Sequence, residues 1–314
     1  MIDIVSHRGR YFILSAVVII LGLISLIAPG GLRLGIDFTG GTLWEIEFGE
    51  DVQPGPIRAA LEGLGYESVV QTTGDKTVLI RTRELPPDSP AKSAAVEALS
   101  DIGGDFVELR FESIGPTVGA EIAQRAVIAV ALACVGILLY LWWAFRQVQG
   151  AFRYGACAVV ALTHDALVVL GTFSILGRIF QVDIDAMFVT AILTVIGFSV
   201  HDTIVVFDRV RENLLRFPNE PFKLVLNHSL FQTLGRSLTT SITVVFTLLA
   251  IILFGGETIK WFAITLIIGI VSGTYSSIFN ASQVLYAWTE GDFTRLFGRV
   301  FRSRTPAGPD VQGA

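Results

Sequence analysis

Four ionisable residues lie within long apolar stretches of this sequence, His164, Asp165, His201 and Asp202, and a fifth, Arg236, opens another such stretch. Inside a membrane such a side chain costs on the order of 2.5–3.5 kcal/mol by insertion scales, so it tends to face the interior of a helix bundle and to serve a function. In apolar surroundings the carboxyl group of Asp202 prefers to be neutral, whereas near an arginine it prefers to be charged. A carboxylate that alternates between two such surroundings can load a proton in one and release it in the other.

Arg236 is a candidate for the second environment of Asp202. The two residues are 34 positions apart, and the intervening hairpin returns the chain to the same membrane face, so the sequence permits a contact without showing one. Arg236 opens a hydroxyl-rich helical face formed by Thr240, Thr243 and Thr247, whose i, i+3, i+7 spacing places them together. These hydroxyls and trapped water could complete a proton path, with Asp165 and His201 as further relay candidates.

A purely structural interpretation competes with this one. An Asp–Arg pair can simply pin two helices together, so that breaking it harms stability without any transport role. His201 points about 100° away from Asp202 on a helix, and it and His164 fit equally well as hydrogen-bonded packing residues. The charged and polar residues at the membrane border fit a topology anchor or a helix-end cap; they are Asp208, Arg209, Arg211, Glu212 and Asn213.

The composition requires a membrane around these residues. Of 314 residues, 52% are apolar and 16% are charged, against about 25% charged in ordinary soluble domains. The mean hydropathy is +0.63. Residues 30–124 carry 7 Lys/Arg and 16 Asp/Glu, so one acidic soluble domain accompanies the membrane domain. Without a basic cluster beside aromatic residues, the chain is a poor candidate for nucleic-acid binding.

Six segments are long and apolar enough to span a bilayer, which takes about 20 residues. They lie near 11–29, 126–145, 154–176, 186–208, 237–254 and 260–286. The first is expected to be an uncleaved anchor, because no A-x-A cleavage pattern precedes Gly30. The predicted organisation is therefore residues 1–29 with the first span, a soluble insert at 30–124, five spans within 125–286, and a Pro/Gly-rich tail at 287–314 that we expect to be disordered.

Lysine and arginine in the short loops predict the orientation. With the N-terminus in the cytoplasm, the inner segments hold 13 of these residues, whereas the short outer loops hold only Arg178 and Lys260. Both termini are thus expected in the cytoplasm of a bacterium, with residues 30–124 on the periplasmic or cell-surface side of the inner membrane.

The residue pattern of the soluble insert predicts a small α+β domain. Strands are expected at 43–48, 67–72, 76–82 and 105–112, with helices at 54–64 and 90–101. The order βαββαβ is typical of a ferredoxin-like split βαβ fold. The insert contains no His and no Cys, so we expect it to bind or position something rather than to catalyse a reaction.

Two glycine-rich motifs flank the insert. The first, GIDFTGG at 35–41, contains Gly35, Asp37, Gly40 and Gly41 and permits tight turns before the first strand. The second, SIGPTVGAE at 113–121, contains Gly115, Pro116 and Gly119 and predicts a stiff, sharply turned link between the soluble domain and the bundle. If that link transmits movement, replacing Gly115 and Gly119 with alanine should impair function while leaving assembly intact.

The sequence contains no motif that would indicate an enzyme. There is no nucleophile–base pair, no metal-ligand spacing and no phosphate-binding GK[ST] loop. Cys134 and Cys157 both lie in apolar runs and are expected to be small packing residues rather than a disulfide or a metal site. We therefore expect no catalytic residue, metal or cofactor, with protons rather than ATP as the energy source of any transport.

Five segments in family order resemble the SecF members of the SecD/SecF protein-export family, which belongs to the wider resistance–nodulation–division group of proton-driven exporters. They are GIDFTGGT at 35–42, SIGPTVGAE at 113–121, HDALVVLG at 164–171, GFSVHDTIVVFDRVREN at 197–213 and TLGRSLTTSIT at 233–243. The resemblance implies half of a twelve-span bundle, with a SecD subunit supplying the other half. The membrane aspartate of the family falls on Asp202 and its partnering arginine on Arg236.

The function implied by this resemblance is late-stage protein export driven by the proton gradient. The implied partners are SecD, the SecYEG channel, the exported polypeptide and membrane lipid, with SecA and YajC as more indirect ones. Two other interpretations remain open: half of a small-molecule or lipid exporter, against which the small size of the insert argues, and an assembly subunit that carries nothing. Under the latter, Asp202→Asn should be harmless.

Overall fold

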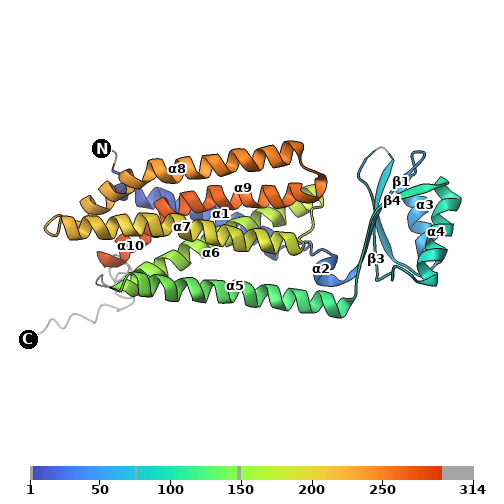
Figure 1. The fold of residues 1–314 in the computed structure, drawn as a ribbon, viewed down its shortest axis with the longest axis horizontal. Helices are drawn as coiled ribbons and strands as arrows, with labels where there is room; N and C mark the ends of the chain where they lie inside the picture. Colours follow the sequence, from blue (N-terminus) through green and yellow to red (C-terminus); the bar gives the residue numbers. More distant parts are fainter. Residues whose placement is uncertain (1–2, 75, 147–149, 292–314) are drawn as a thin grey trace, which may run out of the picture. The chain divides into compact units, whose positions relative to one another are not determined.

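The computed structural model describes residues 3–74, 76–146 and 150–291. The chain forms two compact units (Figure 1). The bundle unit contains residues 1–28, 132–175 and 191–314. The insert unit contains residues 29–131 together with 176–190, the segment that joins two of the long helices. The predicted insert ended at 124 and did not include this second segment, because nothing in its local sequence distinguishes it from an ordinary loop.

The insert unit is built on a four-stranded antiparallel sheet. The strands are β1 (Gly41–Phe48), β2 (Ser68–Thr72), β3 (Thr77–Thr82) and β4 (Phe106–Ile114), in the spatial order β2-β3-β1-β4. Helices α3 (Pro54–Gly63) and α4 (Pro90–Gly103) lie on one side of the sheet in Figure 1. This arrangement confirms the predicted ferredoxin-like βαββαβ topology.

Alternation along the strands explains why the helices cover only one face. Trp44, Ile46 and Phe48 of β1 are fully or almost fully buried and pack with Ile57 and Leu61 of α3. Burying each large apolar side chain stabilises the domain by about 1.5–3 kcal/mol. A register shift between Glu45 and Ile46 in the pairing with β4 marks a bulge. The residues between these core positions point to the opposite face of the sheet.

Six helices in the described part of the chain are long and apolar enough to cross a membrane. Five of them are α1 (Arg8–Ile27), α5 (Pro116–Ala144), α6 (Ala151–Phe180), α7 (Ala186–Arg216) and α8 (Phe222–Phe254). The sixth begins as α9 (Glu257–Ser276), passes through a π-helical segment (Ser277–Ala281) and ends as α10 (Ser282–Thr289). Short helices precede α1 (Val5–His7) and β1 (α2, Ile36–Thr39).

Several helices extend well beyond the predicted spans, because the apolar stretch marks only the part as thick as the bilayer. The helix expected at 126 begins at Pro116, and the helix expected at 237 begins at Phe222. Pro116 suits the first position of a helix, where its missing N–H is not needed. The predicted tail at 287–314 falls partly on α10, and residues 292–314 lie outside the described residues.

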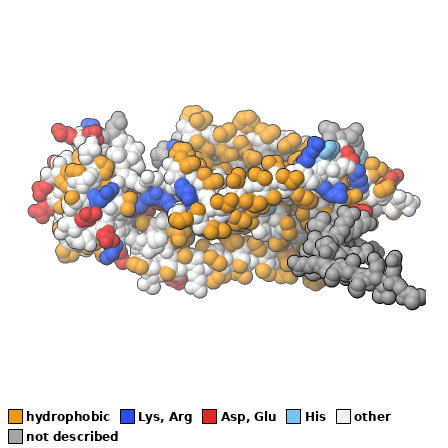
Figure 2. All heavy atoms as spheres, turned by 180° about the vertical axis from the view of Figure 1, so that it is seen from behind, with side chains coloured by type: hydrophobic (Ala, Val, Ile, Leu, Met, Phe, Trp, Pro, Cys, Tyr) orange, Lys and Arg blue, Asp and Glu red, His pale blue; other side chains and the backbone are white. Residues whose placement is uncertain are grey.

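The helices of the bundle differ in how much of their surface the chain itself covers. In the apolar windows of α6, α7 and the α9–α10 helix, 44–61% of residues are buried, against 6–17% in α1, α5 and α8. Hydrophobic side chains accordingly cover much of the face of the bundle shown in Figure 2, while acidic ones gather on the insert. α6, α7 and α9 therefore form the interior, where polar groups must find partners within the protein.

Candidate intramembrane polar site

Asp165 of α6 lies at the centre of the buried polar groups and is completely inaccessible to solvent. Its Oδ2 accepts hydrogen bonds from the hydroxyls of Ser199 (2.6 Å) and Ser276 (2.7 Å). Its Oδ1 accepts one from Ser272 (2.7 Å) and lies 3.0 Å from Nδ1 of His164. Both carboxyl oxygens thus have two partners each, drawn from α6, α7 and α9. We refer to these five residues as the Asp165 cluster.

Two glycines of α9 make this cluster possible. A Cβ atom on Gly273 would lie 3.0 Å from the Cβ of Ser199, and one on Gly269 would lie 2.1 Å from a methyl carbon of Val195. Small residues let membrane helices approach closely, so that short side chains can reach across. The approach of α9 to α7 brings Ser272 within reach of Asp165. The π-helical segment starts directly after Ser276, a feature that often accompanies functional sites in helices.

Asp202 of α7 is also buried, on the side of α9 that faces α8. The Thr274 hydroxyl lies 3.4 Å from its Oδ2. Thr274 in turn shares a hydrogen bond of 2.5 Å with Ser241. α9 therefore supplies hydroxyls to both aspartates, with Ser272 and Ser276 directed to Asp165 and Thr274 to Asp202.

Neither carboxylate has a basic partner other than histidine among the described residues. The contact between Asp202 and Arg236 that the sequence permitted does not occur: Arg236 is exposed and forms no ion pair within the described part of the chain. It lies next to the buried Ser237, so the rotation of α8 turns its side chain outwards. His201 is exposed as well, in agreement with its expected 100° offset from Asp202.

The hydroxyls that follow Arg236 do not reach Asp202 either. Thr240, Thr243 and Thr247 each donate to the backbone carbonyl four residues earlier, at 2.8–3.1 Å. Thr243 and Thr247 are exposed. The predicted hydroxyl face therefore exists, but it points away from the chain's own aspartates.

The polar residues at the end of α7 fasten this helix to the start of α8. Buried Asn213 donates to the Ser229 hydroxyl (2.8 Å) and to Oε1 of Gln232 (2.9 Å), which also accepts from Arg209 at 2.5 Å. Arg209 pairs in addition with Glu212. Asp208 is exposed and lies 3.6 Å from Arg211. These contacts fit the structural interpretation given above, in which the polar residues cap and connect the helix ends.

The first glycine motif fills a crowded corner of the insert unit. Gly40 and Gly41 have φ of 71° and 125°, in the region that favours glycine. A Cβ on Gly40 would lie 2.6 Å from Cα of Pro116, and the backbone N–H of Gly35 donates to the Ile184 carbonyl at 2.7 Å. Oδ2 of Asp37 accepts from the N–H of Ala186, the first residue of α7, at 2.7 Å.

The second glycine motif differs from its prediction. Residues 116–121 are not a sharply turned connector but the first turns of α5, which follows β4 almost directly. A Cβ on Gly119 would lie 2.7 Å from the backbone N of Gly40, whereas one on Gly115 would meet only the flexible side chain of Glu84 at 3.3 Å. The two glycine motifs therefore pack against each other.

This geometry separates the two alanine substitutions that the sequence suggested together. Gly119→Ala is expected to reduce export activity several-fold because backbone must shift on both sides, with overpacking costing about 1–3 kcal/mol. Gly115→Ala is expected to change little, since a side chain can yield. Export assays on assembled protein check both. Equal effects of the two substitutions would contradict this account.

The sequence pattern missed the serines that matter most. Ser272, Ser276 and Ser277 stand in the run SGTYSS at 272–277, an unusual density of small hydroxyls in an apolar span. That density was the available signal, but it does not reveal that Ser272 and Ser276 donate to Asp165, 107 and 111 positions earlier.

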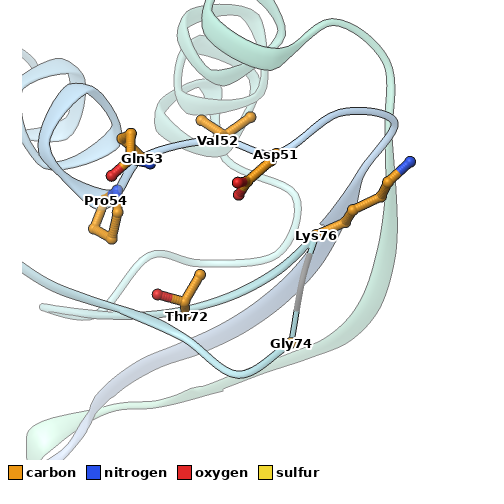
Figure 3. A pocket seen from close by; sticks show the side chains of 7 residues that line it. All are labelled: Asp51, Val52, Gln53, Pro54, Thr72, Gly74 and Lys76. Atoms are coloured by element: carbon orange, nitrogen blue, oxygen red, sulfur yellow. The ribbon is translucent and has the colours of Figure 1, made fainter.

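A hollow in the insert unit offers no comparable chemistry. It has a volume of about 430 Å³ and is lined by Asp51, Val52, Gln53, Pro54, Thr72, Gly74 and Lys76 (Figure 3). Nζ of Lys76 bonds the carbonyl of Gly49 at 2.5 Å. Among the described residues, no group of three or more His, Cys, Asp or Glu side chains is placed to hold a metal ion.

Comparison with known proteins connects this architecture to protein export. Residues 94–291 match the family model of the protein export membrane protein SecD/SecF, C-terminal, and residues 26–52 match the SecD/SecF GG motif. The protein translocase subunit SecF of Thermobaculum terrenum is 53% identical, over 96% of this chain and 98% of the relative. The subunit of the same name from Pseudomonas aeruginosa is 37% identical, over 90% and 91%.

A solved structure shares the fold. The crystal structure of SecDF, a translocon-associated membrane protein from Thermus thermophilus, superimposes with a TM-score of 0.75 at 32% identity. The match covers 90% of this chain but 38% of that one, so this chain spans about two fifths of the SecDF protein.

Fold and site together define a multi-pass helical membrane protein with carboxylates buried among hydroxyls at the centre of its bundle. The protein has six spans, three of which form the interior of the bundle. A ferredoxin-like insert follows the first span, and two glycine motifs pack against each other at its base. The chain belongs to the SecD/SecF family of protein export membrane proteins. It is an accessory subunit of the Sec protein translocase.

Proposed function

We propose that this chain uses the proton gradient across the bacterial inner membrane to drive a late step of protein export, with Asp202 and Asp165 as the proton-carrying groups. The observation that carries the proposal is that α9 hydroxyls contact both buried aspartates, while no lysine or arginine of the described chain neutralises either one. A buried carboxyl group without a fixed counter-charge can gain or lose a proton when its surroundings change, whereas a locked ion pair holds the carboxylate in its charged form.

The energy available fits this role. One charge crossing 100 mV releases about 2.3 kcal/mol, enough to bias a conformational equilibrium roughly fiftyfold if protonation favours one state. The distribution of Lys and Arg supports cytoplasmic termini and an insert on the outer side, where it can act on the emerging polypeptide.

The exposed face of α8 supports a SecD-type subunit as the partner. Arg236, Thr243 and Thr247 are exposed on a helix that also exposes Phe246 and Leu253. A charge and several hydroxyls facing lipid would be costly, so such residues normally face a protein interior. In the proposed complex the partner covers this face and supplies the group that Arg236 pairs with. SecYEG and the exported chain are the further partners.

The test is the substitution Asp202→Asn, assayed as preprotein movement into vesicles with and without a proton gradient. The amide keeps the size of the side chain but cannot bind and release a proton. Export is expected to fall to the level seen without a gradient, while the protein still co-purifies with its SecD partner.

Asp208→Asn is the matched control, because it changes an exposed aspartate of the same helix in the same way. It should leave the gradient-dependent part unchanged. Undiminished stimulation in assembled Asp202→Asn would reduce Asp202 to a structural residue and favour the assembly-subunit interpretation.

A further inference from the structure

The open face of the insert sheet is occupied by residues 181–185, which join α6 to α7; we call this segment the docking loop. The side chain of Gln181 hydrogen-bonds Gln71 on β2, and Asp183 forms an ion pair with Arg81 on β3. The loop therefore contacts two neighbouring strands, β2 and β3, on the face that α3 and α4 leave uncovered.

The backbone holds the docking loop as well. Ile184 donates to the carbonyl of Arg33 and accepts from the N–H of Gly35, both at 2.7 Å, so that it pairs with Leu34 like a short parallel strand. Gly35 must be glycine here, because a Cβ would lie 2.9 Å from the Ile184 oxygen. The loop is thus fixed to the segment just before β1 and to the sheet at once.

Asp183 is the ionic centre of this contact. Its two oxygens bind Nη2 of Arg81 at 2.5 Å and Nε of Arg33 at 3.1 Å, and its side chain is only 17% exposed. Burial raises the pKa of Asp183, and the two guanidinium groups oppose that rise. The buried Nε and Nη1 atoms of Arg81 have no hydrogen-bond partner among the described residues, so Nη2 alone connects this guanidinium group to Asp183. Removing Asp183 would therefore leave a buried cation uncompensated, which is costly.

The docking loop continues directly into α7, the helix that carries Asp202. Asp185 caps this helix by accepting from the N–H of Phe188 at 2.8 Å, and Asp37 of the first glycine motif accepts from Ala186. The first turn of α7 consequently belongs to the insert unit, while the rest belongs to the bundle unit. Any axial shift or rotation of α7 acts on the loop through a continuous helix.

We propose that the docking loop is the mechanical coupling between the proton-carrying helix and the insert domain, with Asp183 as its positioning residue. Asp183 acts through the loop and keeps the sheet and the first turn of α7 together as one body, so that movement of α7 becomes movement of the insert. This inference rests on the proposed function. It adds the docking loop as a second connection, besides the contact between the two glycine motifs.

The test is Asp183→Ala in the full chain, assembled with its partner in vesicles. Hydrogen exchange at the amides of Gly35 and Ile184 is expected to accelerate, while the bundle peptide containing Asp165 stays protected. The gradient-dependent part of export should fall by at least about 5-fold, the lower end of typical coupling between sites, with gradient-independent export unchanged.

Two variants sharpen the measurement. Asp183→Asn keeps the side-chain volume and is expected to give the same kind of loss at smaller size. Glu67→Ala is the control, because it breaks the exposed Arg83–Glu67 ion pair of the same domain, whose side chains are 73% and 83% exposed. Its expected effect is none.

A cross-link distinguishes coupling from mere stability. Gln71→Cys and Gln181→Cys are placed in Asp183→Ala protein in which Cys134 and Cys157 are replaced by alanine, and a short bis-maleimide joins the two thiols. Gradient-dependent export should then recover, because the cross-link replaces the ion pair. Full stimulation in assembled, uncross-linked Asp183→Ala and Asp183→Asn, or no recovery on cross-linking, overturns the proposal. Asp202→Asn is measured alongside: if it retains stimulation, the proposed function fails instead.

Discussion

Replacing Asp165 with alanine is expected to abolish gradient-dependent export and to lower the free energy of unfolding by about 2–5 kcal/mol. The range follows from the three hydrogen bonds to Ser199, Ser272 and Ser276, at about 0.6–1.7 kcal/mol for each such bond between membrane helices. Alanine removes the acceptor that three buried hydroxyls on two other helices share; of the three, Ser276 keeps the Gly273 carbonyl as a second acceptor. Thermal unfolding of the purified protein and export in vesicles measure the two effects.

Asp165→Asn separates the role of Asp165 in proton transfer from its role as a hydrogen-bond acceptor that stabilises the bundle. Its amide retains the shape and one acceptor oxygen, and the serine hydroxyls can rotate to accept from its NH₂ group. Stability should therefore fall by less than about 1.5 kcal/mol, a loss comparable to one net hydrogen bond, while gradient-dependent export should still be lost. If the Asp165→Asn protein remains fully gradient-stimulated, Asp165 is a structural acceptor and proton transfer is confined to Asp202.

Replacing Gly273 with leucine is expected to have the second-largest effect. The Cβ of any larger residue starts 3.0 Å from the Cβ of Ser199, so a leucine must push α9 away from α7. Overpacking of this kind costs about 1–3 kcal/mol, and the shift also carries Ser272 and Ser276 away from Asp165. Both the unfolding midpoint and gradient-dependent export should drop, although no titratable group has been changed.

Gly273→Ala and Gly136→Leu are the matched comparisons. Alanine at 273 requires Ser199 to yield by only a few tenths of an ångström, so a mild effect is expected. Gly136 of α5 has nothing within 4 Å of its Cβ position and is exposed, so leucine there should be tolerated. Equal damage from Gly136→Leu and Gly273→Leu would show that leucine itself, rather than the α7–α9 contact, is responsible.

Much of the architecture could be predicted from local pattern. The thickness of the bilayer demands about 20 apolar residues, so the six spans are visible in hydropathy alone even though their ends are not. Alternation in β1, where Trp44, Ile46 and Phe48 face the core, likewise revealed the insert and its βαββαβ order. The low polarity of the spans also made Asp165 and Asp202 stand out, because charged groups are rare there.

The sequence by itself determined the class of protein, the topology of the insert and the family, since each depends on periodicity or on contiguous motifs. Only the tertiary structure decided which groups meet. Asp165 binds serines 34–111 positions away, Arg236 faces outwards rather than towards Asp202, and Asp183 docks on Arg81 about a hundred residues earlier in the chain. The reason is physical: side-chain direction depends on how each helix is rotated about its axis, and packing of distant glycines and small residues fixes that rotation.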